Sequence, residues 1–408
     1  MLGPALALAA THFGFPLVYY IYARRWLRRP WGVEPRENHT PTITIVIPTY
    51  NEAPLIEAKL EDIARQDYPP DRLQIIVVDS ASTDGTPEKA ERWARRKGAP
   101  VEVLREPQRN GKAHALNLAL RHARGDVVVI TDADSHWPDP QTLRKAVRWL
   151  ADSSVGAVTC LKRPAGGRGV EATYRDYYNV LRLAESKKWS TPIFHGELAA
   201  YRKELLEKIG GFPTHLGADD SHTAVLIAAF GYRAIAAEDL HCVELVPRRY
   251  WRWRVRRAQH LIQSFAASLR LKTPARFKPV LYAEAYLHLV NPWLLPAAFA
   301  AAIAAGPPGW ALAALGLALL AYTPYRTWTA MQIYLIAAAI RNLWTKEITW
   351  KKEDKTPYGR DLEEVETSSM TSVQRSNYHD REYALASIPA TIPNNPRPSA
   401  INQADITP

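Results

Sequence analysis

The amino-acid sequence predicts an α/β fold in which a mostly parallel sheet carries helices on both faces. Short apolar, β-branched runs alternate with helical patterns between Pro41 and Val246, the order that is typical of βαβ units. The run Val127–Ile130 contains no polar side chain, as expected of a strand covered on both faces. With 408 residues the chain is long enough to bury a large core around such a sheet.

The individual elements follow from their residue patterns. β-Branched and apolar runs predict strands at Thr42–Ile47, Leu73–Asp79, Val101–Leu104, Val127–Asp132 and Val155–Cys160. Helical spacing bounded by turn residues predicts helices at Ala53–Arg65, Thr86–Arg96, Lys112–Ala123, Pro140–Ala151 and His222–Phe230. Ligands of such sheets bind at the carboxyl ends of the strands, so we expect a site at that edge.

The composition bears on partners and location. A net charge of +11 admits an anionic membrane, a phosphorylated substrate or nucleic acid. The arginines favour the membrane over nucleic acid, because four follow an apolar N-terminal run and six crowd a Trp-rich segment at 248–257. The two cysteines imply no disulfide framework, which is consistent with a cytoplasmic catalytic domain. Residues 357–408 are rich in Ser, Thr, Asn and Pro and are predicted to be disordered.

Apolar segments predict a multi-pass protein of the cell membrane. Residues 1–23 form the expected N-terminal transmembrane anchor, with its arginine-flanked end in the cytoplasm. A C-terminal transmembrane region is expected at 280–343, with candidate spans at Ala283–Ala305, Trp310–Tyr322 and Thr329–Ala339. The basic tail that follows requires an even number of crossings. Either one candidate is re-entrant or interfacial, or the last two form one long helix.

Residues 247–272 predict an amphipathic helix. The side chains Trp251, Val255, Ala258, Ile262, Phe265 and Leu269 recur at steps of three and four and form one stripe. A basic helix with such a stripe suits the headgroup plane of a lipid bilayer, so we expect an interfacial helix. A helix packed on a soluble domain, with a solvated basic face, is the alternative.

Polar side chains gather where the predicted strands end. Pro48–Glu52 follows the first strand, Asp79 closes the second, and Lys112 opens the third helix. Asp132 and Asp134 close the fourth strand, and such a pair suits Mg²⁺ or Mn²⁺ carrying a diphosphate. No G-x-G-x-x-G follows the first strand and no Walker A pattern occurs, which disfavours dinucleotide oxidoreductases and P-loop enzymes.

A second acidic pair, Asp219 and Asp220, allows two interpretations. Two carboxylates at a helix N-terminus can cap the helix and interact favourably with its dipole. Alternatively, one of them is a general base that removes a proton from a hydroxyl group. Without the other motifs of the chain, the capping role is favoured.

Six motifs occur in order along the chain. They are IVIPTYNE (45–52), VVDSASTDGT (77–86), NGKAHALN (110–117), ITDAD (130–134), GELAAYRKELLEKIGGF (196–212) and ADD (218–220). Their order and spacing resemble those of the family 2 glycosyltransferases, membrane-anchored enzymes with a GT-A fold. The resemblance predicts a GT-A glycosyltransferase domain at 41–246. It implies a metal-dependent, inverting transfer of a sugar from a nucleotide-diphosphate-sugar donor.

The resemblance also implies a role for each matched residue. The residues that would line the nucleotide pocket are Thr49, Tyr50, Glu52, Asp79, Asp132 and, near the ribose or diphosphate, Lys112. The metal ligands would be Asp134, with Asp132 beside it, and His136 as an additional ligand. Asp220 would be the catalytic base that deprotonates the acceptor.

Three departures from the family pattern sharpen the expected function. Ser80 stands where many members have a second aspartate, and Asp219 stands in place of a glutamate. The Gln-x-x-Arg-Trp signature of polymer-making members is absent from Trp253–Arg257. Arg256 and Arg257 remain to bind a diphosphate or a lipid phosphate. We therefore expect transfer of a single sugar to a lipid-linked or saccharide acceptor at the bilayer.

Three other functions stay open. The chain is alternatively a processive polysaccharide synthase. A sugar nucleotidyltransferase would require a Gly-rich, basic loop where Pro48–Glu52 stands. A non-catalytic membrane scaffold with a transferase-like domain is the third possibility, and the acids Asp79, Asp132, Asp134 and Asp220 argue against it.

Overall fold

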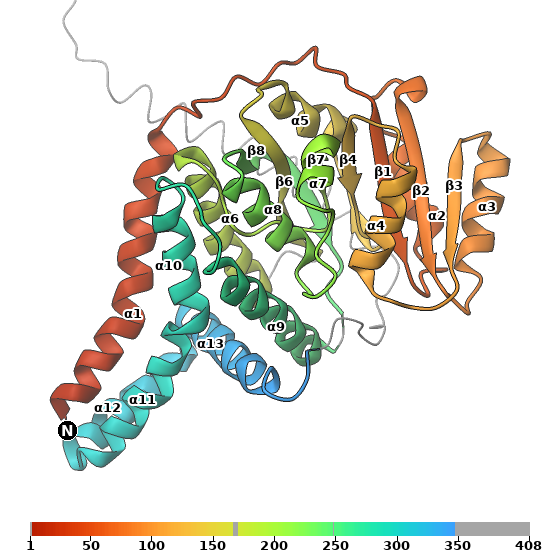
Figure 1. The fold of residues 1–408 in the computed structure, drawn as a ribbon. Helices are drawn as coiled ribbons and strands as arrows, with labels where there is room; N and C mark the ends of the chain where they lie inside the picture. The colour runs from red at the N-terminus through yellow and green to blue at the C-terminus, as the bar shows by residue number, and fades with distance from the viewer. Residues whose placement is uncertain (1, 166–169, 248, 347–408) are drawn as a thin grey trace, which may run out of the picture. The chain divides into compact units, whose positions relative to one another are not determined.

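The computed structural model describes residues 2–165, 170–247 and 249–346, so the segment predicted to be disordered at 357–408 lies outside the described residues. The strands of the described part join in one sheet with the order β3-β2-β1-β4-β7-β6-β8-β5 (Figure 1). They are β1 (Ile43–Thr49), β2 (Leu73–Ser80), β3 (Val101–Glu106), β4 (Val127–Ile130), β5 (Ser135–His136), β6 (Val155–Pro164), β7 (Ala199–Arg202) and β8 (Arg233–Glu244).

The first half of the sheet is the predicted parallel unit. Strands β3, β2, β1 and β4 all run in the same direction, and Ile45 of β1 is in register with Ile75 and Val129. Thr49 lies opposite Asp79 where β1 and β2 end. The register therefore brings the polar residues after these strands to one edge, as expected.

The second half of the sheet contains the two described strands, β7 and β5, that run opposite to the others, so the sheet is mostly parallel, as predicted. Strand β7 is antiparallel to both β4 and β6, and β5 is antiparallel to β8, while β6 and β8 are parallel. Tyr201 of β7 pairs with Val128 and with Ala157, so this short strand joins the two halves.

Helices cover both faces of the sheet because side chains alternate along each strand. Ile45 and Ile47 belong to one apolar core and Val46 to the other. The first core includes side chains of α2 (Ile56–Ala64), α3 (Thr86–Lys97) and α5 (Thr142–Arg148). The second includes side chains of α4 (Lys112–His122), α7 (Lys203–Lys208) and α8 (Asp219–Ala229). The predicted helices therefore form, with their ends moved by a few residues.

Helix α9 (Tyr250–Ser268) corresponds to the predicted amphipathic helix, and other helices cover part of its apolar stripe. Val255 and Ala258 pack against Leu335 and Ala338 of α13 (Thr323–Arg341). Phe265 is buried in a core shared with α6 (Val170–Lys188) and α10 (Lys278–Leu289). Other helices thus cover the middle of the stripe, whereas Trp251 and Leu269 at its ends are 53% and 40% exposed. The expected place of α9 in the headgroup plane stays a prediction.

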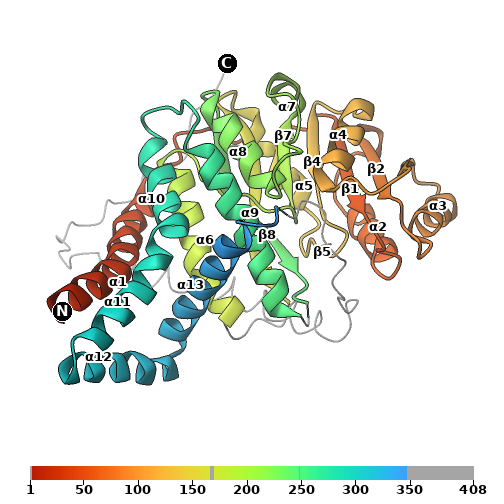
Figure 2. The ribbon, with the colours of Figure 1, turned by 60° about the horizontal axis from the view of Figure 1, so that its bottom comes forward.

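The apolar helices lie on the side of the sheet away from β3 and α3 (Figures 1 and 2). Helix α1 (Leu2–Arg24), with the turn that follows it, is long and apolar enough to cross a membrane. Helices α10 and α11 (Asn291–Ala304) bend by 43° at their junction and meet the same criterion only as a pair. Helix α12 (Pro307–Ala318) is shorter. The described residues thus contain one candidate span, or two with the bent pair, fewer than the multi-pass prediction requires.

Candidate active site

A cavity of about 230 Å³ opens at the carboxyl ends of β1 and β4 and extends to α6 and α9. It brings together residues that lie far apart in the sequence. The predicted site residues that line it are Thr49, Tyr50, Glu52, Lys112, Asp132, Asp134, Asp220, Arg256 and Arg257.

One end of the cavity is acidic around a buried cation. Lys112 Nζ lies 2.7 Å from Asp132 Oδ1 and 3.8 Å from Asp219 Oδ2. Burial opposes the charge of Lys112, but the carboxylates of Asp132, Asp219 and Asp220 outweigh it and raise the lysine pKa. Burial raises the pKa of Asp219 to about 7. The positive charge of Lys112 lowers this pKa, while the negative charges of Asp220 and Asp132 raise it. Further positive charge would stabilise this cluster.

Two glycines permit the close packing around these acids. A Cβ at Gly196 would lie 2.5 Å from Lys112 Nζ and 3.0 Å from Asp132 Oδ2. A Cβ at Gly217 would lie 2.1 Å from the ring of His260 on α9. A side chain at the first position of the 196–212 motif would therefore have to shift the ends of the Lys112 and Asp132 side chains, which form the ion pair.

The second acidic pair begins α8, and its two members differ in access. Asp219 is 5% exposed, whereas Asp220 is partly exposed in the cavity. Asp220 Oδ1 accepts a hydrogen bond from the Ser221 backbone N–H at 2.6 Å. Both acids lie in the first turn of α8, where the helix dipole favours negative charge, but the N-cap residue is Ala218 and it receives no side-chain capping hydrogen bond. Asp220 is the more accessible of the two carboxylates.

Asp79 joins the loops that follow β1 and β2. It is 2% exposed, and its carboxylate accepts hydrogen bonds from Thr49 Oγ1 (3.2 Å) and the Ser82 backbone N–H (2.9 Å). The same loops meet again where Asn51, at a φ of 54°, accepts a hydrogen bond from the Thr83 backbone N–H. Asp79 thus holds these two loops together. It is not among the side chains that line the cavity, and its expected contact with the nucleotide stays a prediction.

Arg109 is a cavity residue that sequence reasoning missed. Its guanidinium lies 3.7 Å from the centre of the Tyr50 ring, and both side chains line the cavity. A cation over an aromatic face is a favourable contact. The one feature of the sequence that could have indicated Arg109 is its position directly before Asn110-Gly111-Lys112.

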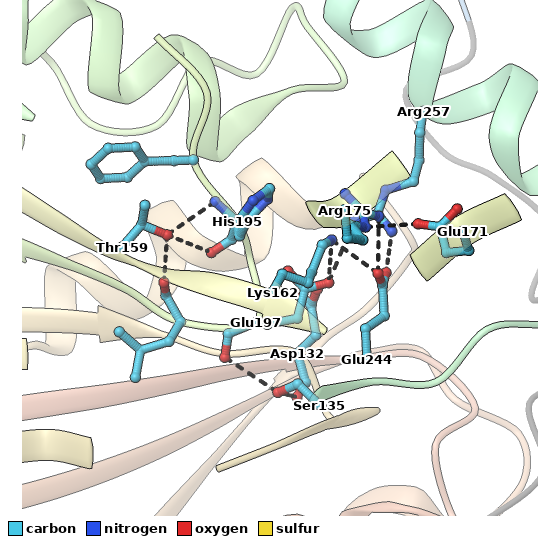
Figure 3. A network of polar contacts seen from close by, with 12 residues as sticks. Asp132, Ser135, Thr159, Lys162, Glu171, Arg175, His195, Glu197, Glu244 and Arg257 are labelled. Carbon is cyan, nitrogen blue, oxygen red and sulfur yellow. Dashed lines mark hydrogen bonds and ion pairs between the residues drawn. The ribbon is translucent and has the colours of Figure 1, made fainter. Parts of the chain in front are cut away.

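The other end of the cavity rests on a buried ionic network (Figure 3). Lys162 Nζ lies 2.8 Å from Glu197 Oε1 and 3.0 Å from Glu244 Oε2. Arg257 of α9 pairs with both glutamates, and Arg175 of α6 lies 3.3 Å from Glu244. Burial opposes ionisation of Glu244, but Arg257 and Lys162 outweigh it and lower its pKa to about 2. Glu244 is therefore ionised at neutral pH.

This network carries an excess of positive charge toward the cavity. Glu171 pairs with Arg175 at 2.7 Å and with Arg254 at 3.5 Å. The cations of this end, Lys162, Arg175, Arg182, Arg254, Arg256 and Arg257, outnumber the glutamates Glu171, Glu197 and Glu244. Guanidinium groups bind phosphate in a two-pronged manner, so this end suits an anionic ligand.

His136 is not among the side chains that line the cavity, and its expected role as an additional metal ligand stays a prediction. It is 6% exposed in β5, and its Nδ1 lies 3.0 Å from Asp62 Oδ1 of α2. Lys59 binds the other oxygen of Asp62 at 3.2 Å. Because β5 pairs with β8, the imidazole is fixed in the interior, where it joins α2 to the sheet.

The acidic end fits a divalent cation that arrives with an oxygen-rich ligand. Asp132 and Asp134 supply carboxylate oxygens, the donors that Mg²⁺ and Mn²⁺ prefer. Asp219 Oδ2 is buried without a hydrogen-bond partner in the described part of the chain. No cluster of three or more His, Cys, Asp or Glu able to hold a metal ion exists among the described residues. A cation here would therefore need further oxygen atoms, such as those of a diphosphate.

Comparison with known proteins places this geometry in a family. The family model for glycosyl transferase family 2 matches residues 44–210. A mannosyltransferase from Pyrobaculum calidifontis, solved with GDP-Man and Mn²⁺, is similar with a TM-score of 0.80 and 60% identity. That similarity covers 84% of this chain and 99% of the other.

Two curated relatives are more distant. The cellulose synthase 1 catalytic subunit of Komagataeibacter xylinus is 28% identical over 57% of this chain, which spans 32% of that protein. The glycosyltransferase AglE of Haloferax volcanii is 28% identical over 49% of this chain, which spans 66% of it. The chain thus spans about a third of the first relative and two thirds of the second. With the motifs, the cavity and the close structural neighbour in agreement, the chain belongs to the family 2 glycosyltransferases.

Proposed function

We propose that the protein transfers mannose from GDP-mannose to a hydroxyl group of an acceptor, with inversion at the anomeric carbon and with the help of Mn²⁺ or Mg²⁺. The observation that carries this proposal is the cavity with an acidic end around Lys112 and a guanidinium-rich end on α6 and α9. The choice of donor and metal is supported by the 60% identical neighbour, which was solved with GDP-Man and Mn²⁺.

The acidic end binds the donor. Tyr50, Glu52 and Thr49 contact the nucleoside, and Arg109 extends the surface formed by the Tyr50 ring. Asp134, with Asp132 beside it, would hold the divalent cation on the diphosphate. When bound, such a cation neutralises charge that develops on the leaving diphosphate. Lys112 keeps Asp132 in place and contributes a positive charge next to the phosphates.

Asp220 acts as the base. Its carboxylate takes the proton of the acceptor hydroxyl, whose oxygen attacks the anomeric carbon from the side opposite to the diphosphate. The bond between that carbon and the diphosphate breaks as the new glycosidic bond forms. Asp219 is less exposed than Asp220 and contacts Lys112, so we assign it to positioning.

The enzyme works at a membrane. Exposed apolar side chains gather on α1, α11 and α12, where Leu17 is 58%, Phe299 48% and Trp310 56% exposed. Such a surface is costly in water and is stabilised by lipid. We propose that these helices anchor the catalytic domain to the cytoplasmic face of the cell membrane, and that one sugar is added to a lipid-linked acceptor.

A donor panel tests this function. The full chain in detergent is mixed with GDP-mannose, UDP-glucose or UDP-N-acetylglucosamine and with membrane lipid extract, and nucleoside diphosphate release is measured with and without EDTA. We expect release from GDP-mannose alone, dependent on the metal. Asp220→Asn should lower turnover by about 10²- to 10⁴-fold while donor binding persists. Asp67→Asn, a surface change outside the cavity, is the matched control.

Three results would count against the proposal. Release of nucleoside diphosphate from a UDP-sugar only would refute GDP-mannose as the donor. Unchanged turnover in Asp220→Asn would refute the base. A long polymer in the products would favour the processive alternative over transfer of a single sugar.

A further inference from the structure

A second cavity of about 220 Å³ lies between α1, α6 and α13. Aromatic and aliphatic side chains form nearly all of its wall. They include Phe13 and Leu17 of α1, Tyr174 and Tyr177 of α6, and Trp328 and Met331 of α13. We call this cavity the helix groove. Its wall carries no Asp, Glu, Lys, Arg or His among the described residues, so it suits hydrocarbon.

The helix groove borders the catalytic cavity. Tyr174 lines both cavities. Arg254, which lines the catalytic cavity, has its guanidinium 4.1 Å from the centre of the Tyr174 ring. The Arg254 guanidinium also donates a hydrogen bond to Met331 Sδ in the groove wall at 2.7 Å. A buried cation therefore stands at the junction between an apolar groove and a polar, guanidinium-rich cavity.

The helix groove is also accessible from the side that carries the exposed apolar surface of α1. Leu17 lines the groove and is 58% exposed. Its neighbours Val18 and Ile21 are 65% and 52% exposed. If α1 lies in a bilayer, as proposed above, a lipid chain reaches the groove from the bilayer without crossing water.

We propose that the helix groove holds the first part of the single hydrocarbon chain of a lipid phosphate that carries the acceptor sugar, with the phosphate at Arg254. This inference rests on the proposed function and specifies its acceptor. Arg254 lies between the apolar helix groove and the polar catalytic cavity. In a lipid phosphate, the negatively charged phosphate likewise lies between a hydrocarbon chain and a sugar, so the two arrangements are complementary. The small volume favours one chain over the two chains of a phospholipid.

The test distinguishes the contribution of the hydrocarbon chain, the contribution of the phosphate and the preference for one hydrocarbon chain over two. The full chain in phosphatidylcholine nanodiscs is titrated with farnesyl phosphate, farnesol, inorganic phosphate and dioctanoyl phosphatidic acid. Leu17→Trp fills the exposed mouth of the groove. Val18→Trp, on the same helix and more exposed but outside the groove wall, is the matched control. Binding of GDP-mannose with Mn²⁺ is measured on the same samples.

We expect farnesyl phosphate to bind at least about tenfold more tightly than the other three probes, and Leu17→Trp to lose this binding by roughly tenfold while Val18→Trp keeps it. Equal affinity for phosphatidic acid, or equal effects of the two variants, would overturn the inference. If lipid binding fails these criteria but GDP-mannose still binds, the groove inference is refuted and the proposed function is not. If the unmodified protein does not bind GDP-mannose, the proposed function itself is refuted.

A second measurement does not depend on a variant. Photolysis of a benzophenone-bearing geranyl phosphate should label peptides that contain residues 13–17, 173–178 or 324–331. Labels confined to other peptides would refute the groove as the lipid site.

Discussion

Replacing Asp219 by asparagine should remove a pH dependence from the stability of the fold. Burial and the neighbouring charges of Asp220 and Asp132 raise the pKa of this carboxyl from 3.8 to about 7, against the pull of Lys112. Between these two values the folded protein binds more protons at this site than the unfolded chain does. Its stability therefore falls as pH rises through that window and levels off above about pH 7.

The size of the effect follows from the shift. From about pH 5 to about pH 8, ionisation of Asp219 costs the folded state on the order of 2–3 kcal/mol. Asparagine resembles the neutral acid, so Asp219→Asn should gain this amount over the unmodified protein across the same interval. A gain of this size corresponds to a few degrees in the unfolding temperature.

Thermal unfolding of the ligand-free protein in detergent, followed by circular dichroism over this pH interval, measures the gain. Ser221→Ala is the control, since it alters the same helix without changing a charge and should shift the unfolding temperature equally at every pH. Parallel pH profiles for Asp219→Asn and the unmodified protein would refute the reasoning, because they would mean that Asp219 ionises in the folded state as it does in the unfolded chain.

Three further outcomes are expected. Gly196→Ala should weaken GDP-mannose binding by roughly tenfold or more, since its Cβ would displace Lys112; isothermal titration checks this, and unaltered affinity would contradict the steric argument. Lys162→Met should destabilise the fold by about 3 kcal/mol or more, because Glu197 and Glu244 lose a buried partner; an unchanged unfolding temperature would show that the arginines suffice. Treatment with EDTA should abolish transfer, and Mn²⁺ should restore it; full activity after chelation would exclude the metal role.

The central strands and helices could be predicted because their local patterns agree with the fold. Runs such as Val127–Ile130 bury both faces of a strand, and alternate residues do enter the two cores. Strand β8 (Arg233–Glu244) was not predicted, because Glu238 and Asp239 interrupt its apolar pattern. Strand β7 has four residues and gives little local signal.

At the acidic end of the site, Lys112, Asp132 and Asp134 could be predicted from position, since parallel strands bring their carboxyl ends to one edge, whereas the role of Asp220 came from the family resemblance. The basic end could be predicted only in part, from Arg256 and Arg257. Lys162, Glu197 and Glu244 are isolated charges in the sequence, and only tertiary packing joins them. The stripe on α9 predicted a helix correctly, but a period of 3.6 residues does not reveal whether lipid or another helix covers the apolar side.

The buried ionic network limits which segments of this chain can be replaced by the matching segments of a related protein. Arg257 belongs to α9, whereas its partners Glu197 and Glu244 belong to the sheet domain. A chimera that takes α9 to α13 from another protein, and lacks an arginine at this place, would leave two buried carboxylates with fewer counter-charges. Such a hybrid should fold only when the acids are changed with the helices. The boundary at residue 246, which looks like a junction between modules, is therefore a poor place to cut this chain.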